Sequence, residues 1–162
     1  MLVLIQSISK QIDLPIVAAG GIVDGKGMAS VFAAGAEGIQ MGTRFVSSAE
    51  SPVHSNFKNT IVNSSIDGTL ILNKKAKPVI RALKTELTEK IDQIGEMDMS
   101  ALMKIKELYF DGNMNAAPAL SGQSVGLIDQ VQNVKDIIDE TINEFNKVCK
   151  DTVSYTHLTL PT

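Results

Sequence analysis

The first 66 residues of this chain alternate between two kinds of apolar pattern. Residues 2–12 carry apolar side chains at helical spacing, whereas Pro15–Ala19 and Glu37–Met41 are short runs that stop at glycine. Proline can open a strand, and a compact apolar body is typical of a strand that is covered on both faces. Between the two runs, Asp24 is a good N-cap for a helix that extends to about Ala34. This order of elements predicts a β-α-β unit with a parallel sheet.

A different pattern follows this unit. Ser51-Pro52 predicts the start of another helix, because proline is favoured at the first helical position. Thr69–Leu72 reads as a short extended segment. From Pro78 onward the apolar stripes predict helices almost throughout, with a break at residues 111–118 and a glycine-bearing turn that runs into a short helix at residues 121–126. The last stripe, from residue 131 to residue 148, predicts a helix of about 18 residues.

These patterns divide the chain into three parts. Residues 1–66 hold the β/α units, residues 67–152 form a helical extension, and residues 153–162 are rich in Thr, Leu and Pro in a way that predicts a non-native tail. Two strands cannot close a barrel, which needs eight β/α units and about 250 residues. The sequence therefore predicts either a small open α/β domain or the C-terminal part of a longer chain. The uncapped first helix and the unusual tail favour the longer chain.

The composition of the chain argues against nucleic-acid, metal and membrane partners. The chain has 162 residues and a formal net charge of −3, which gives no electrostatic case for a nucleic-acid partner. Its one cysteine, Cys149, fits a reducing, cytoplasmic setting. The two histidines, His54 and His157, are too few for a histidine-rich catalytic or metal site, so we expect no metal. No apolar run is long enough to span a bilayer, so we expect no membrane partner.

Two glycine turns carry the candidate chemistry. Gly20-Gly21 and Gly42-Thr43 each follow an apolar run, and glycine leaves backbone N–H groups uncovered. Uncovered N–H groups near a helix start bind phosphate well, and Thr43 can add a hydroxyl hydrogen bond. Because neighbouring parallel strands end at the same edge, we expect one phosphate between the two turns, the position used after the last two strands of a (β/α)8 barrel. The alternative is two tight strand–helix turns without a ligand.

The first turn also comes close to a P-loop. The spacing from Gly20 to Gly25-Lys26 is that of GxxxxGK, but Gly27 stands where Ser or Thr would hold Mg²⁺. This departure disfavours a nucleoside triphosphatase, and it predicts that Lys26 is a solvated residue of the helix.

Several polar residues have two interpretations each. Gln40 would bind a cofactor or be satisfied within the sheet, and Arg44 would reach a phosphate, lie on the surface or pair with a carboxylate. The turn at residues 121–123 would touch a ligand or simply start a helix capped by Ser121, and the residues alone favour the second reading. His54 is expected to be solvated or packed rather than catalytic.

Three segments together resemble a known family: AAGGI at residues 18–22, GIQMGTRF at residues 38–45 and SGQSVGLI at residues 121–128. They are similar to the nitronate monooxygenase (2-nitropropane dioxygenase-like) family, which includes the FMN-dependent enoyl-acyl-carrier-protein reductase II. The resemblance covers about residues 2–150. It implies an α/β fold that is the C-terminal portion of an FMN-binding (β/α)8 TIM barrel, namely its last two strands and helices, followed by a helical extension.

The resemblance also implies a cofactor and its contacts. It places FMN at this chain, with Ser121 and two neighbours near the flavin ring. The cofactor-binding residues that it implies are Gly20, Gly21, Gln40, Met41, Gly42, Thr43, Gly122 and Gln123. The strands that hold the ring, and the family's catalytic histidine, would lie upstream. We therefore expect no catalytic residue in this chain and no activity from the chain alone.

The activity that the resemblance implies is the oxidation of alkyl nitronates with O2, with a small-molecule substrate. The first alternative is the reductase, in which NAD(P)H reduces FMN and hydride passes to an enoyl thioester. Two further alternatives are an inactive fragment and a flavin-free barrel protein that binds phosphate.

Overall fold

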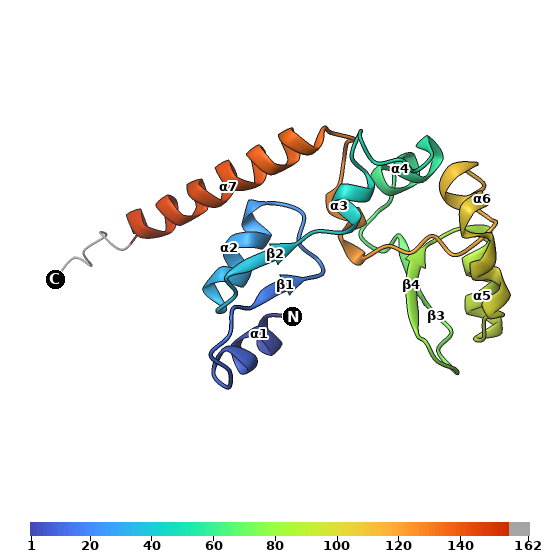
Figure 1. Ribbon diagram of the computed structural model, residues 1–162, viewed down its shortest axis with the longest axis horizontal. Coiled ribbons are helices and arrows are strands. Elements are labelled where there is room, and N and C mark those ends of the chain that lie inside the picture. The colour runs from blue at the N-terminus through green and yellow to red at the C-terminus, as the bar shows by residue number, and fades with distance from the viewer. Residues whose placement is uncertain (156–162) are drawn as a thin grey trace. The chain divides into compact units, whose positions relative to one another are not determined.

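The structure is a computed structural model and describes residues 1–155. The chain forms two compact units (Figure 1). Unit 1 comprises Met1–Met41 together with the helix that begins at Val134, and unit 2 comprises Gly42–Asn133. The prediction that residues 156–162 belong to a non-native tail, and His157 with them, lies outside the described residues.

Unit 1 contains the predicted β-α-β unit. Its helices are α1 (Leu2–Ser9), α2 (Gly25–Ala33) and α7 (Val134–Tyr155), and its strands are β1 (Val17–Ala19) and β2 (Gly38–Gln40). The strands pair in parallel, with residues 17–19 opposite residues 38–40, which confirms the prediction. A small core forms where β1 and α1 pack with α2, from Ile5, Ala18, Ile22, Val31, Ala34 and Ala36.

Close packing of α2 on α7 depends on Gly25. A Cβ atom at this position would lie 2.3 Å from the Phe145 nitrogen and 2.5 Å from the Thr141 oxygen, so no larger residue fits. Phe32 and Phe145 continue the contact, with ring centroids 5.3 Å apart. The predicted N-cap is confirmed, because an Asp24 carboxylate oxygen accepts a hydrogen bond from the Gly27 N–H at 2.7 Å. Gly25, which matches the second glycine of the GxxxxGK pattern, therefore serves helix packing.

Unit 2 is a mixture of short helices and one hairpin-like sheet. Its α-helices are α3 (Thr43–Val46), α4 (Ser55–Val62), α5 (Glu86–Ile94) and α6 (Ile105–Phe110), and its 3-10 helices are η1 (Met99–Lys104) and η2 (Gln123–Leu127). Strands β3 (Thr69–Leu72) and β4 (Ile80–Leu83) pair antiparallel. Ala82 of β4 also bridges to Leu120, so the segment before η2 lies against this sheet.

The prediction that the chain is helical from Pro78 is wrong for residues 80–83. Residues 80–83 form β4, because they pair with β3 and bury Ala82 and Leu83 in the process. The helix begins only after Thr85, whose side chain accepts from the Thr88 N–H while the Thr88 hydroxyl accepts from the Thr85 N–H. The apolar residues of β4 continue the helical stripe of α5 in sequence, so their spacing did not separate the two elements. The extended segment at residues 69–72 is confirmed.

Two predicted helix bounds also differ. The helix predicted from Ser51-Pro52 begins at Ser55 instead, with His54 as its N-cap: the His54 Nδ1 atom accepts from the Asn56 N–H at 3.1 Å. The His54 N–H donates to the Tyr109 carbonyl at 2.6 Å, and this tie to α6 fixes where α4 starts. Helix α7 has 22 residues and includes residues 153–155, the first three of the predicted tail.

The packing at Gly25 gives the first testable prediction. We expect Gly25→Ala to lower the free energy of unfolding of unit 1 by about 1–3 kcal/mol, because the added methyl overlaps the α7 backbone. Gly42→Ala is the control, since its Cβ would meet nothing within 4 Å and its φ of −97° suits any residue. Thermal unfolding followed by circular dichroism measures both. Equal melting temperatures for the two variants would contradict this account of the packing.

Candidate functional site

The Gly20-Gly21 turn lies at the carboxyl end of β1 in unit 1. Both residues have positive φ, +106° and +70°, which side chains other than glycine rarely adopt. A Cβ atom at either position would meet nothing within 4 Å, so the turn borders open space. Neither N–H donates a hydrogen bond to another residue of the described chain. The turn therefore offers two accessible backbone donors.

Gln40 and Met41 lie at the same edge of this sheet, since Gln40 pairs with Ala19. The Gln40 side chain is exposed and makes no hydrogen bond within residues 1–155, so it is not satisfied within the sheet. The Met41 side chain packs against the core of unit 1. The Met41 side chain is half-buried, so part of it is covered by this core.

The N-terminus of α2 is already occupied by carboxylates. Besides the Asp24 cap, Glu144 of α7 accepts from the Gly25 N–H at 2.8 Å and lies 3.5 Å from the Lys26 ammonium. Two negative side chains here repel a phosphate, so this helix end does not serve the first turn as an anion site. The Lys26 side chain is 74% exposed, as predicted, and the structure gives no support to a P-loop.

In unit 2 the second turn contacts the third motif segment. The Thr43 hydroxyl oxygen accepts a hydrogen bond from the Gly122 N–H at 3.1 Å, although the two residues are 79 positions apart. A Cβ at Gly122 would lie 3.6 Å from this hydroxyl, whereas a Cβ at Gly42 would meet nothing within 4 Å. The N–H groups of Gly42 and Thr43 donate to no other residue that the structure describes. The structure thus brings Gly42-Thr43 and Gly122 together, and Gln123, which is exposed, begins η2.

Ser121 does not cap η2, because the N-cap is Gly122 and no side chain caps this helix. Ser121 is only 8% exposed, and its N–H donates to the Arg81 carbonyl at 3.3 Å. Its hydroxyl is buried without a hydrogen-bond partner in the described part of the chain. A buried hydroxyl without a partner is costly, which distinguishes this residue from an ordinary helix start.

Arg44 and His54 have structural roles that the sequence did not reveal. Arg44 is 8% exposed, and its Nη1 donates to the Gln130 carbonyl at 3.0 Å, so it does not lie on the surface. The N-cap role of His54 was missed because histidine is not among the preferred N-cap residues.

Groups with a shifted pKa lie outside both turns. Hydrogen bonds from Ser65 and Lys84 lower the pKa of Asp67, and the Ser100 hydrogen bond lowers the pKa of Asp98. Burial raises the pKa of Tyr109, and the hydrogen bond to Asp139 raises the pKa of Lys135.

Within residues 1–155, no group of three or more His, Cys, Asp and Glu side chains is placed to hold a metal ion. None of the described helices combines the length and apolar character needed to cross a membrane. The turns therefore offer backbone donors rather than acid–base groups.

Relatives of known sequence share most of this chain. The chain is 31% identical to a probable nitronate monooxygenase of Staphylococcus saprophyticus, over 90% of this chain and 42% of that protein. It is 29% identical to the (3aS,4S,5R,7aS)-5-hydroxy-7a-methyl-1-oxo-octahydro-1H-indene-4-carboxyl-CoA dehydrogenase of Rhodococcus jostii, over 84% of this chain and 51% of that protein. The chain thus spans about half the length of the curated relatives that it matches.

Two solved structures also match most of this chain with about half of their own length. FabK from Thermotoga maritima matches 95% of this chain with 36% identity and a TM-score of 0.89, and the match covers 51% of FabK. A nitroalkane oxidase from Streptomyces ansochromogenes matches 93% of this chain with a TM-score of 0.78, over 45% of its own length. At 20% identity, that second likeness is one of fold.

The α/β class predicted from the sequence is confirmed by these structures. The model of the nitronate monooxygenase family matches residues 1–144, which is most of the chain. The resemblance seen in the three sequence segments is therefore confirmed, and this chain belongs to the nitronate monooxygenase family.

Proposed function

We propose that this chain is part of an FMN-dependent oxidoreductase and that it anchors the phosphate of the cofactor. The observation that carries the proposal is the hydrogen bond at 3.1 Å between the Thr43 hydroxyl and the Gly122 N–H. This bond holds the Gly42-Thr43 turn against the segment that leads into η2. The names of the relatives, a monooxygenase and a dehydrogenase, describe oxidoreductases and support the reaction class.

The residues of the two turns fit a phosphate group. A phosphate dianion needs several N–H donors and little negative charge around it. The N–H groups of Gly20, Gly21, Gly42 and Thr43 donate to no other described residue, and neither turn contains an acidic residue. We propose, as the family resemblance implies, that the donors of these turns serve the cofactor. Contacts within one unit support the part of this anchor that the Gly42-Thr43 turn forms with Gly122.

The remaining predicted residues have side chains or backbone groups suited to the rest of the cofactor. When bound, FMN would supply the electron and hydride chemistry through its flavin ring. Gln40 offers an exposed amide, and Met41 offers its backbone beside a half-buried side chain. We propose that Gly122 and Gln123 lie near the flavin and that the Ser121 hydroxyl gains its missing partner when the cofactor binds.

We propose nitronate monooxygenase activity for the complete enzyme, with a nitronate as the small-molecule substrate and O2 as the second substrate. The family match over residues 1–144 and the probable nitronate monooxygenase of S. saprophyticus support this assignment. The (β/α)8 barrel that the resemblance implies is likewise a proposal, supported by the parallel pairing of β1 with β2. Neither turn contains an acidic, basic or histidine side chain, so we propose that this chain holds no catalytic residue and does not turn over substrate by itself.

The second candidate function is the reduction of an enoyl thioester with NAD(P)H. Its specific support is the 36% identity to FabK over 95% of this chain, which exceeds the identity to the nitroalkane oxidase. The CoA ester in the name of the R. jostii relative points to thioester chemistry as well.

The phosphate anchor predicts a difference between two flavins. We expect FMN to bind this chain at least about tenfold more tightly than riboflavin, which lacks the phosphate, because hydrogen bonds to a charged group are the strong ones. Gly42→Val should remove most of this difference, because its side chain would fill the open space beside the donors that the phosphate needs. Since a Cβ atom at Gly42 meets nothing within 4 Å, we expect the fold to remain intact. Flavin fluorescence titration measures both affinities.

The control for this titration is Ala49→Val, which enlarges another exposed residue of unit 2. It should bind FMN like the unaltered chain. Equal affinities for FMN and riboflavin would contradict the phosphate anchor, and an absence of FMN binding would favour the flavin-free or inactive alternatives.

The Thr43 hydroxyl predicts a second pair of variants. Thr43→Val removes the acceptor for the Gly122 N–H, so we expect about fivefold weaker FMN binding and faster hydrogen exchange at the Gly122 amide. Thr43→Ser keeps the hydroxyl and should retain both properties. If valine and serine behave alike in exchange and in affinity, the hydrogen bond does not position this loop.

The two candidate activities differ in what reduces the flavin. In a polypeptide extended in its reading frame to the length of the relatives, we expect a nitronate to bleach the flavin under anaerobic conditions and NADH or NADPH to leave it oxidised. Stopped-flow absorbance of the flavin measures this. The opposite pattern would assign the reductase function, and we expect neither reaction from the 162-residue chain alone.

A further inference from the structure

The guanidinium of Arg81 is a cation without a carboxylate partner in the described part of unit 2. Its Nη1 atom donates to the Thr69 hydroxyl oxygen at 2.9 Å, and the side chain makes no other hydrogen bond within residues 1–155. No described carboxylate forms an ion pair with it. Because an arginine side chain has five N–H donors, most of the hydrogen-bonding capacity of Arg81 is unused.

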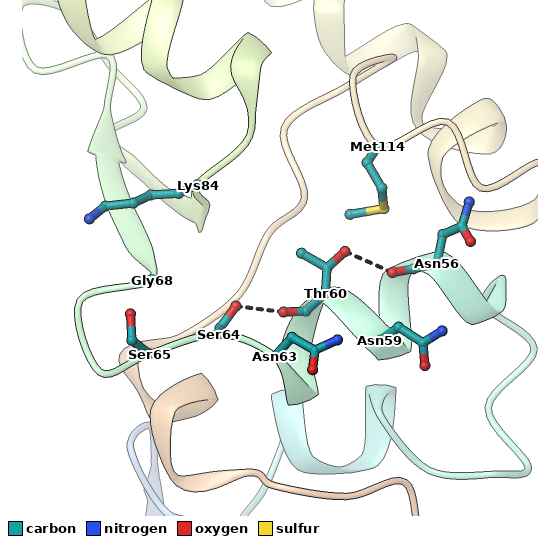
Figure 2. A pocket seen from close by; sticks show the side chains of 9 residues that line it. All are labelled: Asn56, Asn59, Thr60, Asn63, Ser64, Ser65, Gly68, Lys84 and Met114. Carbon is teal, nitrogen blue, oxygen red and sulfur yellow. Dashed lines mark hydrogen bonds between the residues drawn. The ribbon is translucent and has the colours of Figure 1, made fainter.

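Lys84, which directly follows β4, is the comparison for Arg81. Its ammonium lies 3.1 Å from an Asp67 carboxylate oxygen, so its charge is balanced by a neighbour. Figure 2 shows the Lys84 side chain extending away from the asparagines of α4. Asp67 therefore serves Lys84, and the more deeply buried of these two cations is the one that has no carboxylate.

The position of Arg81 in the sheet defines what its side chain faces. Strand β4 lies between β3 and the segment at Leu120, and the Ser121 N–H donates to the Arg81 carbonyl at 3.3 Å. Arg81 therefore has Ile71 opposite it on one side and Ser121 on the other. Residues directly opposite each other in antiparallel strands share one face, with their Cβ atoms about 5 Å apart. Arg81 and Ser121 thus lie side by side on the same face.

The guanidinium lies along this face and is partly shielded from solvent. Arg81 is half-buried, and its hydrogen-bond partner Thr69 is 8% exposed. Leu83, the residue opposite Thr69, is completely buried. A half-buried cation has lost part of its hydration, so an anion that binds its remaining donors stabilises it. The position consequently favours an anionic ligand.

The geometry of a guanidinium favours a small planar anion with two oxygens. Its N–H groups lie in one plane and match the two oxygens of a carboxylate in a bidentate pair. One positive charge balances one negative charge, whereas a phosphate dianion needs several donors from more than one group. A nitronate resembles a carboxylate in this respect, since two oxygens on one planar centre share a single negative charge. The parent nitroalkane has the same two oxygens but no net charge.

We propose that Arg81 binds a planar two-oxygen anion, a nitronate or a carboxylate, and thereby selects an anionic ligand over its neutral counterpart. The nitronate source deepens the proposed function and rests on it. Ser121 lies beside Arg81 and precedes Gly122, whose N–H donates to the Thr43 hydroxyl, so the anion would lie next to the segment proposed to face the flavin. Arg81 is a specificity-determining residue here, because a guanidinium stays protonated and exchanges no proton with the ligand.

The test is a titration of the flavin-free chain with ethyl nitronate and, separately, with acetate, followed in ¹⁵N NMR spectra. We expect saturable shifts of the Arg81 Nε–H signal and of the Thr69 and Ser121 backbone amides. The chain has two arginines, and Arg44 is an internal control because it is 8% exposed and donates to the Gln130 carbonyl. Its Nε–H signal should not move, and neutral nitroethane should move neither arginine signal.

Variants at two cations separate this site from a general effect of charge. Arg81→Met removes the unpaired charge, so we expect at least about tenfold weaker binding of both anions, read from the Ser121 amide. Arg81→Lys keeps the charge without the planar fork, and its loss should be smaller. The matched control is Lys84→Met, which removes a cation that Asp67 already balances and should bind like the unaltered chain. The melting temperature of each variant shows whether it is folded.

The outcomes separate this inference from the proposed function. Binding of either anion supports the site, and the tighter of the two identifies its source. The site is overturned if neither anion moves the Arg81 signal, if nitroethane moves it equally, or if Arg81→Met binds like the unaltered chain. FMN titration of the same samples is independent: if FMN binds and neither anion does, only the Arg81 proposal fails, whereas anion binding without FMN binding contradicts the cofactor proposal alone.

Discussion

A hydrogen bond from the Gly122 N–H to the Thr43 hydroxyl joins distant parts of the sequence in unit 2, and the proposed cofactor site of this unit depends on it. Thr43 begins α3, the first element after β2, whereas Gly122 leads into η2 after the long excursion through β3, β4, α5 and α6. The bridge from Ala82 to Leu120 brings the same segment against the sheet of unit 2. The cofactor-binding residues that the family resemblance implies in unit 2 thus lie together because this segment returns to the start of the unit.

In unit 1, glycine decides both the packing of the helices and the position of the accessible backbone donors. Gly25 allows α2 to approach α7, and the carboxylates of Asp24 and Glu144 satisfy the N-terminus of α2. This helix end is therefore closed to an anion, and the accessible donors are those of Gly20-Gly21 at the strand end. Two neighbouring glycine-rich stretches, at residues 20–21 and 25–27, consequently have different roles: one offers backbone donors, and the other serves helix packing and capping.

The predictions from sequence were correct where neighbouring residues alone determine the local structure. Asp24 as an N-cap and the parallel pairing of the two strands each follow from patterns within residues 15–41. The sequence failed at residues 80–83, because apolar spacing fits a helix as well as a strand and only pairing with β3 decides. It also failed at the start of α4, which a backbone bond from His54 to distant Tyr109 determines. The bond from Thr43 to Gly122 was beyond prediction by pattern, although the resemblance grouped both residues.

The central claim is that backbone N–H groups of the glycine turns bind the FMN phosphate. Backbone amide shifts in ¹⁵N NMR spectra, recorded while inorganic phosphate and then FMN are added, test it most directly. The account predicts saturable shifts at Gly20, Gly21, Gly42 and Thr43 with both ligands, and none at residues 25–27, where carboxylates cap α2. Shifts at residues 25–27 alone, or no shift at the four turn residues, would contradict it.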